Sequence, residues 1–228
     1  MLSAVLSCQG LIPSRLFRSS AMKFRPMFQV VPEGVEGEVK ISHFEVSKMD
    51  STFTMIRAMQ NPLSYVPEGV YCRLTVGRTL MMTDTSMEKR SNYGVVQNSR
   101  GNVLIAGLGI GMVLLPILEK PEVETVTVIE KYKDVIKLVE THIREAAGDA
   151  GKKLQVIVAD IFEWVPPKGG KWDTLYFDIW PDMCTDNLKD MEKLHRKFAR
   201  RKTPGAWMDS WQKDYLKYQK QREKRCRW

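Results

Sequence analysis

The sequence feature that most constrains the fold is an alternation of apolar runs with amphipathic segments, which begins near residue 101. The apolar runs have strand length, as in NVLIAG, VETVTVIE, LQVIVAD, WDTLYFDIW and GAWMDSW, and segments such as DVIKLVETHIREAA have helical periodicity. Strands that are apolar along their whole length are buried on both faces, as in a parallel sheet covered by helices. The alternation therefore predicts a doubly wound, mostly parallel α/β sheet.

The sequence before this alternation has a different pattern. There EVKISHFEV alternates like a strand, VYCRLTVGRTLMM predicts a hairpin that turns at Gly77, and TFTMIRAMQNP predicts a helical turn. We expect a small β-rich N-terminal subdomain at residues 28–98 and a Rossmann-type domain at residues 99–228. Residues 1–27 contain no acidic residue, and we interpret them as a disordered leader or a mis-assigned start, with Met22 as the alternative first residue, in preference to a targeting peptide.

Charge and composition limit the classes of partner. The formal net charge is +8, and much of the excess lies after Lys189. A basic C-terminal helix can bind nucleic acid, but a solvated helix face explains the same pattern, and we favour this second interpretation. No apolar run approaches the ~20 residues that cross a bilayer, so we expect no membrane partner.

The cysteines and histidines predict neither a metal site nor a disulfide framework. The four cysteines lie far apart, and the three histidines are equally scattered. Zinc sites and disulfide-rich domains place such residues in closely spaced sets. We therefore expect no metal, a reducing compartment and a cytoplasmic location.

A glycine loop, Gly107 to Gly111, follows the first apolar strand and opens a helix. Its glycines, Gly107, Gly109 and Gly111, allow the backbone to turn tightly and to approach a ligand, and the helix behind them offers unpaired N–H groups. Dinucleotide-binding loops follow the pattern G-x-G-x-x-G, whereas here the third glycine comes one position early and Met112 stands where that pattern has glycine. The spacing therefore disfavours a dinucleotide-dependent oxidoreductase.

Acidic residues follow three more of the predicted strands. Glu130, with Lys131 beside it, ends the second strand, Asp160 and Ile161 follow the third, and Asp178 follows the fourth. Doubly wound sheets bind ligands at the carboxyl ends of their strands, near the point where the strand order reverses. Four signals at four successive strand ends therefore predict one ligand site at this edge.

The compressed G-x-G-x-G loop and these strand ends resemble class I S-adenosyl-L-methionine-dependent methyltransferases. The resemblance implies that the glycine loop accommodates the methionine part of S-adenosyl-L-methionine. It also implies that Glu130 accepts hydrogen bonds from the ribose hydroxyls and Asp160 accepts one from the adenine amino group, while Ile161 packs on the ring. Lys131 joins this expected cofactor-binding set through its place beside Glu130.

Within that superfamily the chain is similar to spermidine synthases, in which a small β-rich subdomain precedes the same domain. GRTLMMTDTSMEKRSNYGVV resembles their segment ahead of the glycine loop, and Asp178 matches the aspartate that acts in them as a base on the attacking amine. The chain differs from them at Ile110, where they carry an aspartate, and at Glu88, near the place of their glutamine. Because the sequence ends one helix after the fifth strand, we expect a sheet that is abbreviated at the C-terminus.

The leading functional hypothesis is an enzyme, an S-adenosyl-L-methionine-dependent methyltransferase with a small-molecule acceptor of unknown identity. The alternatives are a spermidine synthase-like aminopropyltransferase of polyamine chemistry and a non-catalytic S-adenosyl-L-methionine-binding module; homodimerisation is left open. Asp178 and Asp182 are the candidate catalytic residues, because a carboxylate can position an acceptor or take its proton. Two other roles stay open: Asp178 holds the amine of the cofactor, and Asp182 caps the helix that starts near residue 185.

Overall fold

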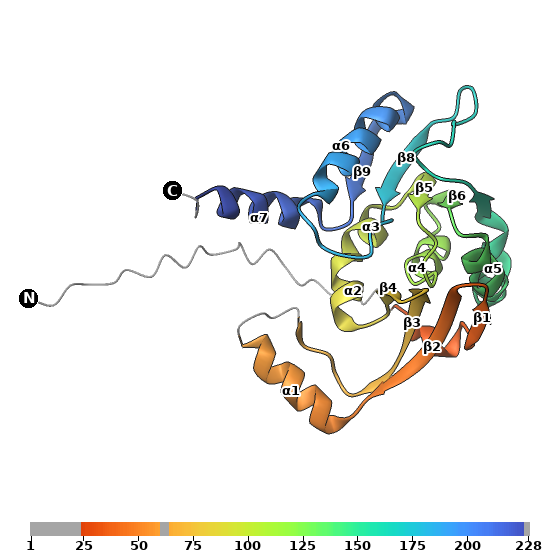
Figure 1. Ribbon diagram of the computed structural model, residues 1–228. Helices are drawn as coiled ribbons and strands as arrows, with labels where there is room; N and C mark the ends of the chain where they lie inside the picture. Colours follow the sequence, from red (N-terminus) through yellow and green to blue (C-terminus); the bar gives the residue numbers. More distant parts are fainter. Residues whose placement is uncertain (1–23, 60–63, 226–228) are drawn as a thin grey trace, which may run out of the picture.

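The computed structural model describes residues 24–59 and 64–225, which contain a parallel and an antiparallel sheet (Figure 1). Within these residues the parallel sheet has five strands in the order β7-β6-β5-β8-β9, so the order reverses between β5 and β8. The predicted doubly wound α/β fold is confirmed. The strands are β5 (Gly101–Ala106), β6 (Val123–Glu130), β7 (Leu154–Val158), β8 (Trp172–Phe177) and β9 (Lys202–Ser210).

Helices cover both faces of the parallel sheet because alternate residues of each strand point to opposite sides. On β5, Val103 and Ile105 belong to one hydrophobic cluster, together with Val139 of α5 (Lys133–Ala147). Leu104 of the same strand belongs to the other cluster, together with Leu194 of α6 (Asn187–Phe198). The terminal helix α7 (Lys213–Arg225) packs on this second face.

The helix after the glycine loop is shorter than predicted. The sequence predicts a helix over residues 111–120, whereas α4 spans only Leu114–Leu118. Gly111 adopts a left-handed backbone conformation, with φ of 74°, which cannot continue into a right-handed helix. Pro116 then falls in the first turn of α4, where its missing N–H breaks no intrahelical hydrogen bond.

The antiparallel sheet is built from the N-terminal part of the chain. Within the described residues its strands run in chain order, β1 (Gly34–Glu36), β2 (Val39–Val46), β3 (Gly69–Val76) and β4 (Thr79–Thr83). The predicted hairpin joins β3 to β4 and turns at Gly77, whose φ is 56°. Between β2 and β3 lies α1 (Lys48–Ala58), a longer helix than the predicted turn, which begins with a reciprocal capping box between Ser47 and Asp50.

Two short helices lie in the predicted β-rich subdomain, in a stretch to which the sequence analysis assigns no element. They are α2 (Ser86–Ser91) and α3 (Tyr93–Asn98), which connect the two sheets. Six residues are too few to show a helical period in the sequence, so the pattern gives no sign of them. Short 3-10 segments also occur at Met27–Gln29, Gly148–Lys153 and Ala199–Arg201.

One hydrophobic cluster joins the two sheets. Met27, Ile41 and Leu74 from the N-terminal part belong to the same cluster as Val103 of the parallel sheet. Of the predicted leader, residues 1–23 lie outside the described residues. The last residues of the predicted leader, 24–27, are part of the fold, because Met27 is fully buried and its N–H donates to Asp84. No helix in the described residues combines the length and the apolar character that a bilayer crossing needs.

Candidate functional site

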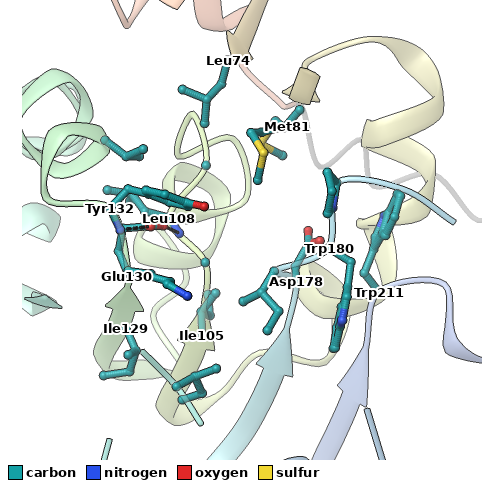
Figure 2. A pocket seen from close by; sticks show the side chains of 18 of the residues that line it. Leu74, Met81, Ile105, Leu108, Ile129, Glu130, Tyr132, Asp178, Trp180 and Trp211 are labelled. Atoms are coloured by element: carbon teal, nitrogen blue, oxygen red, sulfur yellow. Dashed lines mark hydrogen bonds between the residues drawn. The ribbon is translucent and has the colours of Figure 1, made fainter. Parts of the chain in front are cut away.

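A cavity of about 450 Å³ lies at the carboxyl ends of β5, β6, β7, β8 and β9. The backbone hydrogen bonds of the sheet continue one residue past the strands. The N–H of Gly107 donates to the carbonyl oxygen of Ile129, the N–H of Asp178 donates to that of Ala106, and the N–H of Trp211 donates to that of Phe177. Residues that follow neighbouring strands are therefore held side by side along one edge. The opposite wall comes from β3, β4 and α2, so both sheets enclose the cavity (Figure 2).

The glycine loop contacts protein atoms at each of its three glycines. A Cβ on Gly107 would lie 2.1 Å from the carbonyl oxygen of Asp178, and one on Gly109 would lie 2.4 Å from Sδ of Met82. A Cβ on Gly111 would lie 2.4 Å from Cδ1 of Ile143. All three also have positive φ, so the packing of the chain alone already requires glycine. Gly107 and Gly109 line the cavity, and Gly111 packs behind it.

Glu130 ties the glycine loop to the end of β6. Its side chain is buried, with 6% of the residue exposed, and its Oε2 accepts a hydrogen bond of 2.7 Å from the N–H of Leu108. Its Oε1 accepts another, also of 2.7 Å, from the N–H of Tyr132. Burial raises the pKa of Glu130, and these hydrogen bonds oppose the shift. Figure 2 shows Glu130 and Tyr132 at the side of the cavity next to Leu108.

Asp160, Lys131 and Ile161 lie together on the same side of the cavity. Oδ1 of Asp160 accepts from the N–H of Phe162 at 2.9 Å, and its Oδ2 lies 3.0 Å from Nζ of Lys131. The hydrogen bond from Phe162, followed by the contacts with Lys131, lowers the pKa of Asp160. Ile161 is buried and lines the cavity beside them.

Asp178 and Asp182 lie in different environments. Asp178 lines the cavity, and Figure 2 shows its carboxyl directed inward, between Met81 and the tryptophans. Burial, and secondly the nearby Glu88 carboxyl, raise the pKa of Asp178 well above its usual value. Asp182 is exposed and does not line the cavity, and only its backbone carbonyl is engaged, by Asn187. The helix α6 takes Asp186, not Asp182, as its N-terminal flanking residue.

Glu88 on α2 and Asn92 directly after it extend the polar part of the site. Glu88 lines the cavity with only 8% of the residue exposed, and burial raises its pKa to about 7. Asn92 is fully buried, bonds to Asp178 and accepts a hydrogen bond of 2.9 Å from the hydroxyl of Tyr176. The sequence pattern places Glu88 only near a family glutamine and does not indicate Asn92, because their positions depend on how α2 packs against the sheet.

An aromatic wall, Trp180 and Trp211, stands beside Asp178 (Figure 2). Trp180 is 9% exposed and packs in the second hydrophobic cluster. Trp180 therefore both belongs to the core and lines the cavity. Trp211 directly follows β9, and its Nε1–H donates to Oγ of Ser91 at 3.0 Å, which fixes α2 against this edge. The strand-end rule that indicates Asp160 and Asp178 applies equally to Trp211, so the sequence contained a signal for it.

The chemistry of the cavity suits an organic ligand with hydroxyl, amino and apolar parts. In the described residues, no group of three or more His, Cys, Asp or Glu side chains is arranged to hold a metal ion. Carboxylates at the ends of β6 and β7 can accept hydrogen bonds, and Ile161 and Trp180 offer apolar surface. The volume falls within the range of about 300–1,000 Å³ that small-molecule sites occupy.

No family model and no curated protein matches the sequence. The fold is similar to that of a glycopeptide N-methyltransferase, MtfA, solved with (S)-adenosyl-L-methionine, at 17% identity over 53% of this chain and 48% of that chain, with a TM-score of 0.40. The CcbJ methyltransferase from Streptomyces caelestis matches at 16% identity over 53% and 45%, with a TM-score of 0.38. YjhP from E. coli matches at 19% identity over 54% and 47%, with a TM-score of 0.41. The chain spans about half the length of these structures, and the likeness is one of fold.

Proposed function

We propose that the protein is an S-adenosyl-L-methionine-dependent methyltransferase. The observation that carries this proposal is the grouping, around one cavity, of the glycine loop, Glu130, Asp160 and Asp178 at successive strand ends. An adenosine ligand needs a hydroxyl acceptor, an amino acceptor and an apolar surface for its ring. Glu130 at the end of β6 and Asp160 and Ile161 just after β7 supply these three in neighbouring positions.

The donor-binding residues are compatible with such a ligand. Backbone N–H groups of Leu108, Tyr132 and Lys131 donate to the Glu130 carboxylate, and a carboxylate has about four acceptor sites, so capacity remains for a ribose hydroxyl. Asp160 is partly exposed, and its Oδ2 contacts the exposed amino group of Lys131. When a ligand amino group displaces Lys131 from Asp160, water can solvate the displaced lysine. We assign Lys131 the role of holding Asp160 ionised.

The mechanism that follows is an in-line displacement in a water-poor cavity. The bound cofactor supplies a methyl group on a sulfonium. The glycine loop lies against Asp178, so the reactive end of the donor and this carboxyl share the β5–β8 part of the cavity. Asp178 orients the acceptor and accepts its proton, and the aromatic wall limits the access of water.

Two other assignments are not supported by the structure. Ile110, at the position where spermidine synthases carry an aspartate, is fully buried and does not line the cavity. It therefore offers no polar contact to an aminopropyl donor, and the comparisons give the spermidine synthase-like branch no support. Asp182 is left out of the proposed machinery because it is exposed and outside the cavity.

Calorimetric titration with S-adenosylhomocysteine tests the proposal. We expect binding to the wild-type protein, weakened about tenfold or more in Glu130→Gln and Asp160→Asn, because each change removes a charged hydrogen-bond acceptor. Asp182→Asn is the matched control, since it alters an exposed carboxyl outside the cavity and should bind like the wild type. Circular dichroism checks that each variant is folded. A folded wild-type protein that does not bind the ligand would contradict the proposal.

A further inference from the structure

We propose that the exposed sides of α6 and α7 bind single-stranded nucleic acid. This inference goes beyond the proposed function and does not depend on it. It starts from the distribution of charge along the chain. Residues 187–225, which include both helices, contain 13 Lys and Arg residues and five Asp and Glu residues, a net charge of +8. This stretch therefore carries the whole formal net charge of the protein.

The exposed side of α6 is basic. The side that packs in the second hydrophobic cluster carries Leu188, Met191, Leu194 and Phe198. Lys189, Lys193 and Arg196 are all exposed and follow one another at spacings of four and three residues, which places them on one side of the helix. We call these three residues the basic face. Like charges at this spacing destabilise a helix, so the stability of the fold does not explain them.

The basic face is not neutralised within the part of the chain that the structure describes. None of the ion pairs among residues 24–59 and 64–225 includes Lys189, Lys193 or Arg196. Unpaired cations along an exposed helix attract a polyanion, which releases counterions when it binds. The sequence pattern alone favours a solvated helix face, whereas the arrangement of these charges in the structure favours a bound polyanion.

The exposed side of α7 adds aromatic rings beside the basic face, since α6 and α7 contact each other. Leu216 is the buried residue of α7, and Tyr215, Tyr218 and Arg222 follow one another on another side, at spacings of three and four residues. The two tyrosines are 37% and 56% exposed. The guanidinium carbon of Arg222 lies 5.9 Å from the centroid of the Tyr218 ring. Exposed rings among cations are the groups on which the bases of a nucleic acid stack.

The tyrosines favour nucleic acid over other polyanions. An acidic peptide supplies carboxylates but no bases that can stack on these rings. Helices that bind an anionic membrane insert Leu, Phe or Trp, whereas α7 contains one leucine, the buried Leu216, and neither of the other two. In a duplex the bases already stack on one another, so exposed rings favour a single strand.

The surface adjoins the cavity. Nζ of Lys193 lies 4.9 Å from the centroid of the Phe162 ring, and Phe162 lines the cavity. Trp211, which also lines the cavity, precedes α7 by two residues. In Figure 1 both helices lie on the β8–β9 side of the parallel sheet. A strand bound along the basic face therefore passes close to the cavity.

Fluorescence anisotropy with a labelled single-stranded oligonucleotide of mixed sequence, as DNA and as RNA, tests this inference on the full chain. We expect micromolar or tighter binding of at least one of them at about 50 mM salt. Three phosphate contacts predict that the logarithm of the binding constant falls against the logarithm of the salt concentration with a slope of about −2 or steeper. Replacing the basic face by Lys189→Gln, Lys193→Gln and Arg196→Gln together should weaken binding about tenfold or more and make this slope shallower by about 2.

A control variant separates a specific surface from general attraction to a basic protein. Lys40→Gln, Lys133→Gln and Lys168→Gln together change the net charge equally but alter exposed lysines outside α6 and α7. This variant should bind the oligonucleotide within about twofold of the wild type. Equal weakening in the two triple variants, both folded by circular dichroism, would overturn the inference.

Tyr218→Leu tests the contribution of stacking. We expect binding about fivefold weaker or more, with the salt slope unchanged, because loss of a ring contact releases no counterions. Absence of oligonucleotide binding at low salt would overturn the inference. Tighter binding to phosphatidylserine vesicles, polyglutamate or duplex DNA than to either single strand would overturn it as well. Each of these measurements is made without S-adenosylhomocysteine, so neither result changes the test of the proposed function.

Discussion

The carboxyl of Glu88 shows how one residue links the site to the stability of the fold. Its pKa rises from 4.5 to about 7 because it is buried. The folded protein therefore holds a proton on Glu88 at pH values where the unfolded chain has released it. This proton stabilises the fold fully below about pH 4.5, and the stabilisation is lost as the pH rises through about 7.

Glu88→Gln should change the pH dependence of unfolding accordingly. At about pH 8 the variant is expected to exceed the wild type in unfolding free energy by on the order of 2 kcal/mol, because it removes the cost of a buried charge. At about pH 5 the difference should be small, since Glu88 is then protonated in the folded protein. Urea denaturation at both pH values measures this. Equal stabilities at the higher pH would show that the Glu88 carboxylate is well solvated.

At the same scale, the sequence predicted some of the residues that lie around the cavity and missed others. Glu130, Asp160 and Asp178 follow strands, and a strand end in a parallel sheet fixes the edge at which a residue lies. Asn92 has no such marker, because its place depends on a hydrogen bond to Tyr176, far away in the sequence. The reason for the glycines was also incomplete, since Gly107 is required by the carbonyl of Asp178 as well as by any ligand.

At the scale of elements, the sequence predicted the long, buried elements accurately and missed the short ones. β6 has the predicted bounds, Val123–Glu130, because a long apolar run between two turns allows little else. The helix α5 ends at Ala147 and is followed by Gly148, a residue that commonly ends helices. The short helices α2 and α3 were not predicted, because tertiary contacts and not local periodicity hold them.

The anchor of α2 is Asp84, and its removal provides a test at this scale. Asp84 is fully buried, accepts from the N–H groups of Met27 and Cys72 at 2.9 and 2.7 Å, and pairs with Lys89 at 3.6 Å. Asp84→Ala leaves these donors unsatisfied, so we expect a loss of about 3 kcal/mol in unfolding free energy. Denaturant titration measures the loss.

The matched control for this change is Asp149→Ala. Asp149 forms an ion pair of 2.7 Å with Lys152, but both side chains are highly exposed. Exposed pairs contribute about 0–1 kcal/mol, so the control should unfold nearly like the wild type. A loss in Asp84→Ala no greater than in the control would show that the buried carboxylate does not anchor α2.

At the scale of the whole molecule, the shared hydrophobic cluster predicts one cooperative unit. Met27 and Ile41 of the N-terminal part pack in the same cluster as Val103 and Val126 of the parallel sheet. The sequence pattern separated two regions correctly in their strand types, but it did not indicate that they share a core. Such a contact joins residues far apart in the chain, and neither period nor composition records it.

Ligand binding should therefore stabilise both parts together. With S-adenosylhomocysteine at about 100 times its Kd, linkage predicts a gain of about 2.7 kcal/mol. Hydrogen exchange followed by mass spectrometry should show added protection in β2 and β3 as well as in β5 and β6, and thermal unfolding should remain a single transition. Two transitions, of which the ligand shifts only one, would contradict this view.

The segment that carries Glu88 has a consequence for how such a chain can diversify. α2 belongs to neither sheet, and its place depends on Asp84 before it and on the contact of Ser91 with Trp211. Residues between these anchors can change without altering the register of any strand. Under the proposed function, this segment is separate in sequence from the donor-binding residues Glu130 and Asp160, so its cavity-facing residues can change while the donor-binding framework is kept.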